Sequence, residues 1–125
     1  MTVVLDTNAL MMPVECDIRV FEELQRLLGT VDPIVPEQVL AELDSLSDGA
    51  SEAATAASVG FDLAERCRVV EAEPDYADDA VLAVARRDGV EYALTNDKPL
   101  RERLLAAGVP VISLRGEHKL AITHP

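Results

Sequence analysis

The chain has 125 residues and a formal net charge of −12, with 23 acidic residues against 11 Lys and Arg. This length corresponds to one ordinary domain, and the negative charge excludes a basic protein that coats nucleic acid. Aromatic residues make up only 3% of the chain, which argues against base stacking as the main mode of ligand capture.

The basic residues are unevenly divided between the two types. Lysine occurs only at Lys98 and Lys119, and every other basic residue is an arginine. An acidic, lysine-poor surface is typical of proteins adapted to high salt, so we expect a halophilic, archaeal-like protein, the alternative being an ordinary acidic protein. In molar salt the Debye length is about 3 Å. The negative charge therefore does not exclude a nucleic-acid partner.

The two cysteines, Cys16 and Cys67, form no C-x-x-C pair. We expect both to be small buried residues in a reducing compartment. The apolar run at the N-terminus is too short for a signal peptide, and no apolar stretch is long enough to cross a membrane. These features predict a cytoplasmic protein without a membrane partner.

Apolar spacing and turn residues predict strands that alternate with helices along the whole chain. Such alternation is typical of a single α/β domain with an open, parallel, five-stranded sheet and helices on both faces. We expect residues 1–114 to form the core and residues 115–125 a C-terminal tail. In chain order, the expected elements are a strand at 2–5, a helix at 16–28, a strand at 34–35, a helix at 36–46, a helix at 52–66 crowded near Gly60, a strand at 68–71, a helix at 78–87, a strand at 92–95, a helix at 99–107 and a strand at 109–114.

Acidic residues follow two of the expected strands directly. Asp6 comes after the first strand and Asp97 after the fourth. A lone Asp at such a position is ordinarily a helix cap or a turn residue. In an open parallel sheet, however, ligands bind beyond the carboxyl ends of the strands. Two matching strand ends therefore favour a shared site.

Helices contribute further acids to the same edge. Glu42 lies at the margin of the apolar stripe of its helix, where the alternative is a solvated side chain. Asp78 and Asp79 open the helix before the fourth strand, where one would serve the helix N-terminus and the other, taken to be Asp79, would point into the site. Clustered carboxylates require protonation or a cation. Oxygen ligands without His or thiolate indicate Mg²⁺ or Mn²⁺.

Four motifs occur in order along nearly the whole chain: V-V-L-D-T-N-A-L, P-E-Q-V-L-A-E-L, A-D-D-A-V-L-A-V-A and A-L-T-N-D-K-P-L. In these motifs the chain resembles the PIN domains, metal-dependent ribonucleases that include VapC-type toxins and rRNA-processing nucleases. Its ending, G-V-P-V-I-S-L-R-G, is more similar to the rRNA-processing branch than to the short toxins.

The resemblance implies a metal-dependent endoribonuclease in which a water attacks the phosphodiester in line and leaves a 5′-phosphate and a 3′-hydroxyl. The family often has a further acid after the last one, where this chain has Pro99 and Leu100, and this puts a complete second metal site in doubt. By the resemblance, the catalytic, Mg²⁺- or Mn²⁺-binding acids are Asp6, Glu42, Asp79 and Asp97, and the residues that support them are Thr7, Asn8, Asp78, Thr95 and Asn96.

Positive side chains near this edge are the candidates for contacting an RNA backbone. The chemistry fits either an RNA- or pre-rRNA-processing nuclease, which would meet ribosome-assembly proteins, or a VapC-type toxin restrained by an antitoxin, and PIN domains often form homodimers. The proposed RNA-binding residues are Lys98, Arg101, Arg115 and Lys119, with Arg19 and Arg103 as further candidates.

Two alternatives belong to other functional classes. One is a non-catalytic PIN scaffold that binds RNA or protein, which the retained acids argue against. The other is a phosphotransfer domain of the receiver or haloacid-dehalogenase type, since both place an Asp after the first strand. The dehalogenase pattern requires a second Asp where this chain has Asn8. Neither phosphotransfer type explains Glu42 or Asp79.

Overall fold

A computed structural model describes residues 1–125 as one six-stranded sheet in the order β3-β2-β1-β4-β5-β6. The first five strands in sequence pair in parallel, and β6 pairs antiparallel with β5. The parallel α/β fold expected from the sequence is confirmed. The strands are β1 (Thr2–Leu5), β2 (Asp32–Pro36), β3 (Arg68–Val70), β4 (Tyr92–Leu94), β5 (Val111–Arg115) and β6 (Lys119–Thr123).

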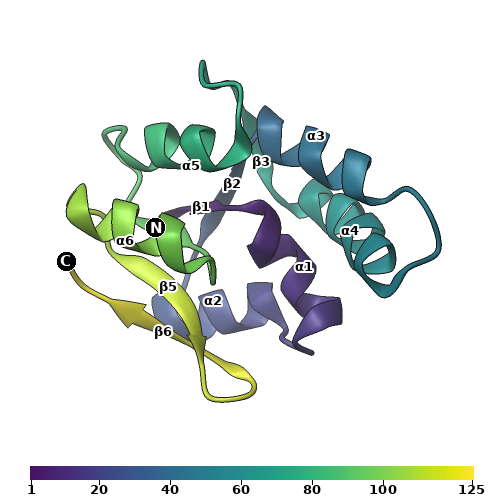
Figure 1. Ribbon diagram of the computed structural model, residues 1–125. Helices are drawn as coiled ribbons and strands as arrows, with labels where there is room; N and C mark the ends of the chain where they lie inside the picture. Colours follow the sequence, from purple (N-terminus) through teal and green to yellow (C-terminus); the bar gives the residue numbers. More distant parts are fainter.

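Helices connect all the parallel strands (Figure 1). They are α1 (Thr7–Glu15), α2 (Val20–Leu28), α3 (Glu37–Leu46), α4 (Glu52–Leu63), the 3₁₀ turn η1 (Ala64–Arg66), α5 (Ala77–Ala85) and α6 (Lys98–Ala106). From β1 the chain first moves to β2 and β3, then crosses back to β4 and β5 on the other side of β1. Because such crossovers are right-handed, α5 and α6 cover the face opposite to α1 and α2.

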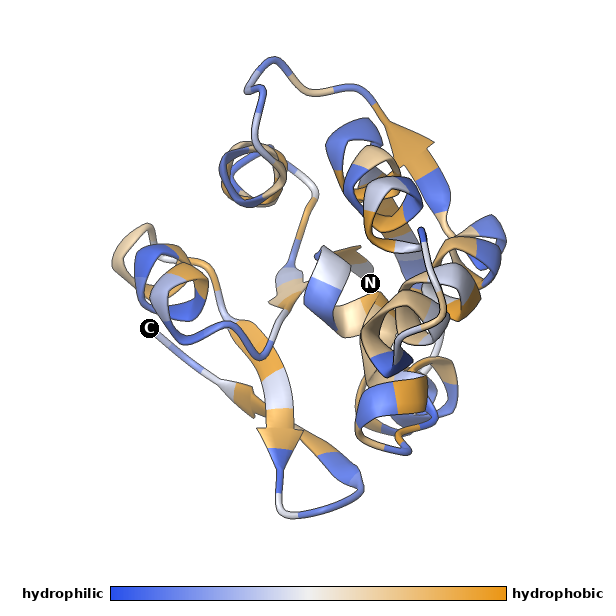
Figure 2. Cartoon of the chain, turned by 45° about the vertical axis from the view of Figure 1, so that its right-hand side comes forward, coloured by the Kyte–Doolittle hydropathy of each residue, from blue (hydrophilic) through white to orange (hydrophobic).

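The core is built mainly from aliphatic side chains of β1 and its neighbours. Val3, Val4 and Leu5 of β1 are fully buried, and they pair with β2 on one side and β4 on the other. A strand buried on both faces needs a continuous apolar run, which is the pattern found there. The helices instead alternate between hydrophilic and hydrophobic residues within each turn (Figure 2).

The C-terminal segment is not the tail that the sequence analysis expected. Lys119–Thr123 forms the edge strand β6, and Leu120 is buried in the core. The free edge of β6 is covered by α2: Arg26 donates to the Leu120 carbonyl (2.9 Å), and Glu23 accepts from the Leu120 N–H (2.9 Å). The two residues that form each contact are nearly a hundred positions apart in sequence. Local sequence patterns therefore did not indicate them.

Helix α1 is the second departure from the predicted elements. The expected helix at 16–28 begins only at Val20, and a separate helix occupies Thr7–Glu15 despite Pro13 within it. Asp17, with a backbone φ of 52°, lies in the left-handed region between the two helices. Pro13 removes one helical hydrogen bond. Burial of four neighbouring residues, from Ala9 to Met12, holds the helix in place.

Gly60 allows α4 to pack closely against α1. A Cβ at this position would stand 2.7 Å from the carbonyl oxygen of Leu10 and 3.3 Å from Leu43 Cδ2. The first contact is closer than real Cβ atoms approach, and the atom it meets is backbone. The crowding that the sequence suggested near Gly60 is thus a helix–helix contact. It fixes α1, which begins at Asp6.

Gly60→Ala should therefore destabilise the protein by about 1–3 kcal/mol, as overpacking does, although alanine favours a helix by up to about 1 kcal/mol over glycine. Urea unfolding measures the change. Ser58→Ala, on the exposed side of the same helix, is the matched control and should be neutral or slightly stabilising. Equal stability of Gly60→Ala and wild type would contradict the close contact.

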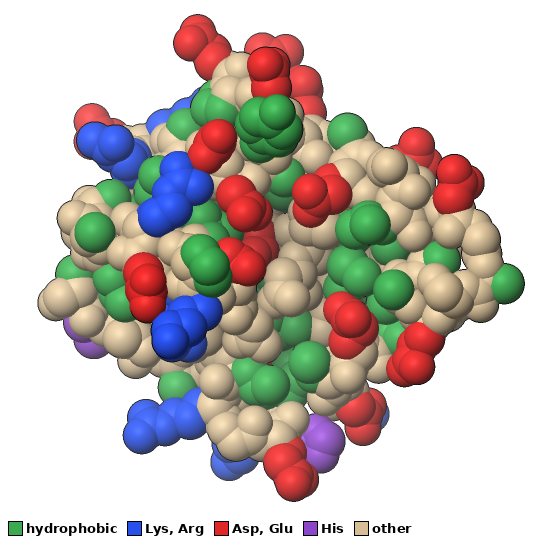
Figure 3. Space-filling model, in the orientation of Figure 1, with side chains coloured by type: hydrophobic (Ala, Val, Ile, Leu, Met, Phe, Trp, Pro, Cys, Tyr) green, Lys and Arg blue, Asp and Glu red, His purple; other side chains and the backbone are tan.

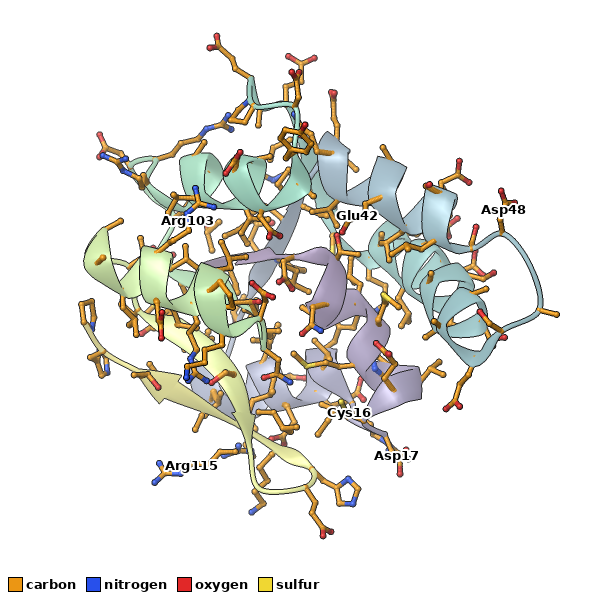
Figure 4. All side chains as sticks on the ribbon, in the orientation of Figure 1. Cys16, Asp17, Glu42, Asp48, Arg103 and Arg115 are labelled. Carbon is orange, nitrogen blue, oxygen red and sulfur yellow. The ribbon has the colours of Figure 1, made fainter.

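No helix combines the length and the apolar character needed to cross a membrane. Both cysteines are free thiols, as expected. Cys67 is buried, and burial raises the pKa of its thiol to about 12. Cys16 is only half-buried, near the end of α1 (Figure 4), so the expectation that both cysteines are buried is wrong for Cys16.

Candidate active site

An open pocket of about 340 Å³ lies at the carboxyl ends of β1 and β4. The strand order reverses between these two strands, and this switch point is where ligands bind in open α/β sheets. Acidic side chains gather in the middle of this face of the molecule (Figure 3). The pocket is lined by Asp6, Thr7, Asn8, Met11, Glu15, Glu42, Leu46, Asp78 and Asp97.

Asp6 forms the floor of the pocket and is only 2% exposed. Its Oδ1 accepts from the Ala9 N–H (2.7 Å) and caps α1, while its Oδ2 accepts a hydrogen bond from the Thr95 hydroxyl. Burial nevertheless raises the pKa of the Asp6 carboxyl to about 7, and the nearby Asp78 and Asp97 add to the rise. Two hydrogen bonds thus do not compensate for the desolvation of this charge.

Thr95 links the two acids that follow neighbouring strands. Its hydroxyl donates to Asp6 and accepts from the Asp97 N–H (2.9 Å). Asp97 Oδ2 in turn accepts from the Leu100 N–H (2.9 Å) and caps α6. Both aspartates are therefore helix caps and, at the same time, line one pocket. The two interpretations of these aspartates, as helix caps and as residues of a shared site, are therefore compatible.

Two asparagines hold the strand ends in register beside the acids. Asn8 Oδ1 accepts from the Asn96 N–H (3.1 Å), which joins the start of α1 to the end of β4. Asn96 Oδ1 accepts from the Leu114 N–H (2.8 Å), which joins the end of β4 to β5. Both side chains act as braces. They fix the spacing of the loops that carry Asp6 and Asp97.

Glu42 and Asp78 enter the pocket from the two sides of its rim. Glu42 extends from α3 on the side that faces α1 (Figure 4). Partial burial raises the pKa of Asp78, and the negative charges of Asp97 and Glu42 raise it further. These charges act on Asp78 because the three carboxylates line the same pocket.

Asp79 does not line the pocket, in contrast to the expectation that it, rather than Asp78, would point inward. Its Oδ1 accepts from Arg103 Nη2 at 2.8 Å, and Arg103 extends from α6 toward α5 (Figure 4). Successive residues of a helix point about 100° apart. Asp78 therefore faces α3 and Asp97, whereas Asp79 faces α6. The D-D sequence alone could not distinguish the two.

The sequence analysis did not predict three residues that line the pocket, Met11, Glu15 and Leu46. Asn8, Met11 and Glu15 recur at helical spacing along α1, so recognising α1 as a helix would have placed them on one face with the pocket. Glu15 adds a fifth carboxylate at the rim. Met11 and Leu46 give the α1–α3 side an apolar wall.

The donors in the pocket suit a hard divalent cation. All its charged groups are carboxylates, and it contains neither histidine nor cysteine. The Thr7 hydroxyl is buried without a hydrogen-bond partner. No three His, Cys, Asp or Glu side chains stand close enough together to enclose an ion. Mg²⁺, however, usually keeps several waters and takes only one or two carboxylates, which Asp6 and Asp97 can supply.

Four of the positive side chains expected to meet RNA are carried by α6 and by the β5–β6 hairpin. Lys98 follows Asp97 at the start of α6, and Arg101 lies one turn further on. Arg115 and Lys119 face each other across the β5–β6 hairpin, with Arg115 pointing into solvent (Figure 4). Arg19, by contrast, lines a separate pocket beside α2. Arg103 is engaged with Asp79.

A sequence model described as a PIN like domain matches residues 3–117. The chain belongs to the PIN-domain family. A curated relative, Ribonuclease VapC4 of Methanocaldococcus jannaschii, is 27% identical over 117 residues, which cover 90% of this chain and 89% of the relative. The resemblance noted in the sequence is therefore confirmed.

Two solved structures superpose over almost the whole domain. The PIN domain endonuclease Utp24 matches with a TM-score of 0.80 and 26% identity, covering 99% of this chain and 92% of that structure. A domain of functionally unknown protein from Methanocaldococcus jannaschii matches with a TM-score of 0.63 and 18% identity, covering 94% of each chain, and shows the fold alone. The strand order β3-β2-β1-β4-β5 also differs from the 2-1-3-4-5 order of receiver domains.

Proposed function

We propose that this PIN domain is a divalent-metal-dependent endoribonuclease. The observation that carries the proposal is the convergence of Asp6, Glu42, Asp78 and Asp97 on one open pocket with no basic side chain in its lining. Such a site repels a phosphodiester until a cation is bound. The names of two relatives, a ribonuclease and a PIN endonuclease, support the same activity.

Asp6 and Asp97 would hold the cation, because a helix-capping hydrogen bond orients each carboxylate before any ligand arrives, and the Thr95 hydroxyl also holds the carboxylate of Asp6. A bound Mg²⁺ or Mn²⁺ would polarise the scissile phosphate and lower the pKa of an attacking water. Glu42 and Asp78, on the exposed rim, would orient that water and accept its proton. The products would carry a 5′-phosphate and a 3′-hydroxyl.

The RNA backbone would run along the α6 and β5–β6 side of the pocket. Lys98, Arg101, Arg115 and Lys119 lie there, whereas α3 and the segment before α5 are acidic. High salt would screen the overall charge of −12. We therefore expect the local arrangement of charge, and not the net charge, to decide how RNA approaches.

Two cellular roles remain proposals for this activity: processing of RNA or pre-rRNA, and toxicity restrained by an antitoxin. Both use the same chemistry in the same pocket. Growth arrest on expression of wild type, relieved by Asp97→Asn and by a small protein encoded beside it, would favour the toxin. A non-catalytic scaffold would bind RNA equally well with and without the acids.

The activity is tested by incubating purified protein with looped and single-stranded RNA in Mn²⁺, in Mg²⁺ and in EDTA. We expect cleavage with either metal, none in EDTA, and products with 5′-phosphate ends. Asp97→Asn should lose the activity while keeping its circular dichroism spectrum. Equal cleavage by wild type and Asp97→Asn would indicate a contaminating nuclease and would reject the proposal.

A further inference from the structure

Tyr76 is the most exposed large hydrophobic side chain of the domain, with 75% of its surface accessible. The other tyrosine, Tyr92, is half-buried in β4. No hydrogen bond engages the Tyr76 hydroxyl with the protein, so neither packing nor polar contact accounts for the ring. A single exposed apolar residue needs no explanation by itself. Its position is what gives it significance.

Tyr76 is close in sequence to a residue that lines the acidic pocket. Tyr76 is the N-cap residue of α5, and Asp78, two residues later, lines the pocket. Two consecutive peptide units span at most about 7 Å between Cα atoms. Hydrophobic side chains lie directly beside the acidic centre of this face (Figure 3). The backbone that carries Tyr76 is therefore directly next to the rim of the pocket, at a separation that one nucleotide can span.

The segment that presents the ring is held by hydrogen bonds. Gln38 Nε2, on α3, donates to the carbonyls of Ala72 (2.6 Å) and Pro74 (2.7 Å). The Tyr76 carbonyl accepts from the Ala80 N–H (2.9 Å) at the first turn of α5. A tyrosine on a fixed backbone has only two side-chain torsions to order on binding. It therefore offers contact area at a low entropic cost.

The surrounding charges determine which part of a nucleotide this ring can receive. The segment carries Glu71, Glu73 and Asp75, all exposed, and these repel phosphate groups. A nucleobase is uncharged and stacks well on an aromatic ring. The cations that suit phosphates lie across the pocket, beginning at Lys98. A strand crossing the pocket can therefore have its backbone toward α6 and a base toward Tyr76.

We propose that Tyr76 is a stacking platform for one base of the RNA strand beside the scissile phosphate. The inference rests on the proposed function, and it adds a residue that positions the substrate without touching the reacting atoms. One such contact agrees with the scarcity of aromatic residues in the chain. Because every base has a stacking face, the contact would discriminate bases from abasic positions more than one base from another.

Fluorescence tests the contact directly, because the chain contains no tryptophan. Tyr76→Trp places a single indole at the site, and Glu42→Gln is added to slow cleavage in Mg²⁺ while leaving the proposed metal ligands Asp6 and Asp97 in place. Titration with a short single-stranded RNA should quench this fluorescence, whereas an abasic strand of equal charge should not. Phe61→Trp, at a position on α4 that is 41% exposed and outside the pocket lining, is the matched control and should not respond.

Kinetics in the enzyme that retains Glu42 provide the second readout. Tyr76→Ala should raise KM for single-stranded RNA by about 5- to 100-fold and leave kcat within about threefold, whereas Tyr76→Phe should retain the wild-type KM. Cleavage with an unchanged KM in Tyr76→Ala, together with unquenched Tyr76→Trp, would overturn the stacking role and leave the nuclease assignment intact. If wild type cleaves no RNA, the nuclease assignment fails, and the quenching experiment alone decides whether Tyr76 binds a base.

Discussion

Asp78→Asn should reduce the rate of RNA cleavage by at least about 100-fold, whereas Asp79→Asn should leave it within about threefold. The two residues are neighbours in sequence, but only Asp78 lines the pocket and is repelled by Asp97 and Glu42. Loss of groups that merely support a metal site already costs about 10- to 100-fold. Initial rates at saturating Mn²⁺ and RNA measure the difference.

The pair forms its own control, because the substitution is chemically identical at both positions. Asp79→Asn loses an exposed ion pair with Arg103, which is worth no more than about 1 kcal/mol of stability. Similar melting temperatures would show that neither variant is simply misfolded. A large loss of activity in Asp79→Asn, with Asp78→Asn active, would contradict the assignment of Asp78 rather than Asp79 to the site.

Asp6→Asn should abolish cleavage and yet raise the melting temperature of the metal-free protein at pH 8. In the folded protein, burial raises the pKa of Asp6 to about 7 from 3.8. A carboxyl with a raised pKa contributes stability below pH 4, and this contribution is lost as the pH rises through 7, since the buried group must then ionise. Asparagine has the same shape and no charge to bury.

The free energy of unfolding of Asp6→Asn should exceed that of wild type by about 2–4 kcal/mol at pH 8. One pKa unit corresponds to about 1.4 kcal/mol, and about 1 kcal/mol is subtracted for a weakened hydrogen bond with Thr95. For a chain of 125 residues this corresponds to a rise in Tm of about 8–15 °C. The gain should disappear near pH 4, and saturating Mn²⁺ should stabilise wild type but not the variant. A lower Tm for Asp6→Asn than for wild type at pH 8 in EDTA would contradict the conclusion that the ionised, buried Asp6 carboxylate destabilises the folded protein.

The parallel sheet was predictable because its signals are local. Each buried strand is a continuous apolar run, and Asp6 and Asp97 follow two of these runs directly. Their adjacency in space is confirmed by the pairing of β1 with β4. The edge strand β6 was missed because its partner contacts, from Glu23 and Arg26 to Leu120, depend on residues distant in sequence.

The rim of the site was less predictable than its floor. Whether Asp78 or Asp79 faces the pocket depends on the rotation of α5, which is set by packing against α3 and α6 and by Arg103. Because Pro13 lies within α1, the sequence did not indicate this helix or the helical spacing of Met11 and Glu15. Sequence patterns therefore indicate which strands deliver acids. They do not show how the adjoining helices are turned.

The central claim is that the pocket between β1 and β4 holds a divalent cation on Asp6 and Asp97. Crystals soaked in Mn²⁺ at a concentration that supports cleavage test it through the anomalous signal of the metal. The account predicts a peak between the carboxylates of Asp6 and Asp97, absent from crystals of Asp97→Asn. An anomalous map without a peak there, or with its only peak at another surface, would contradict it.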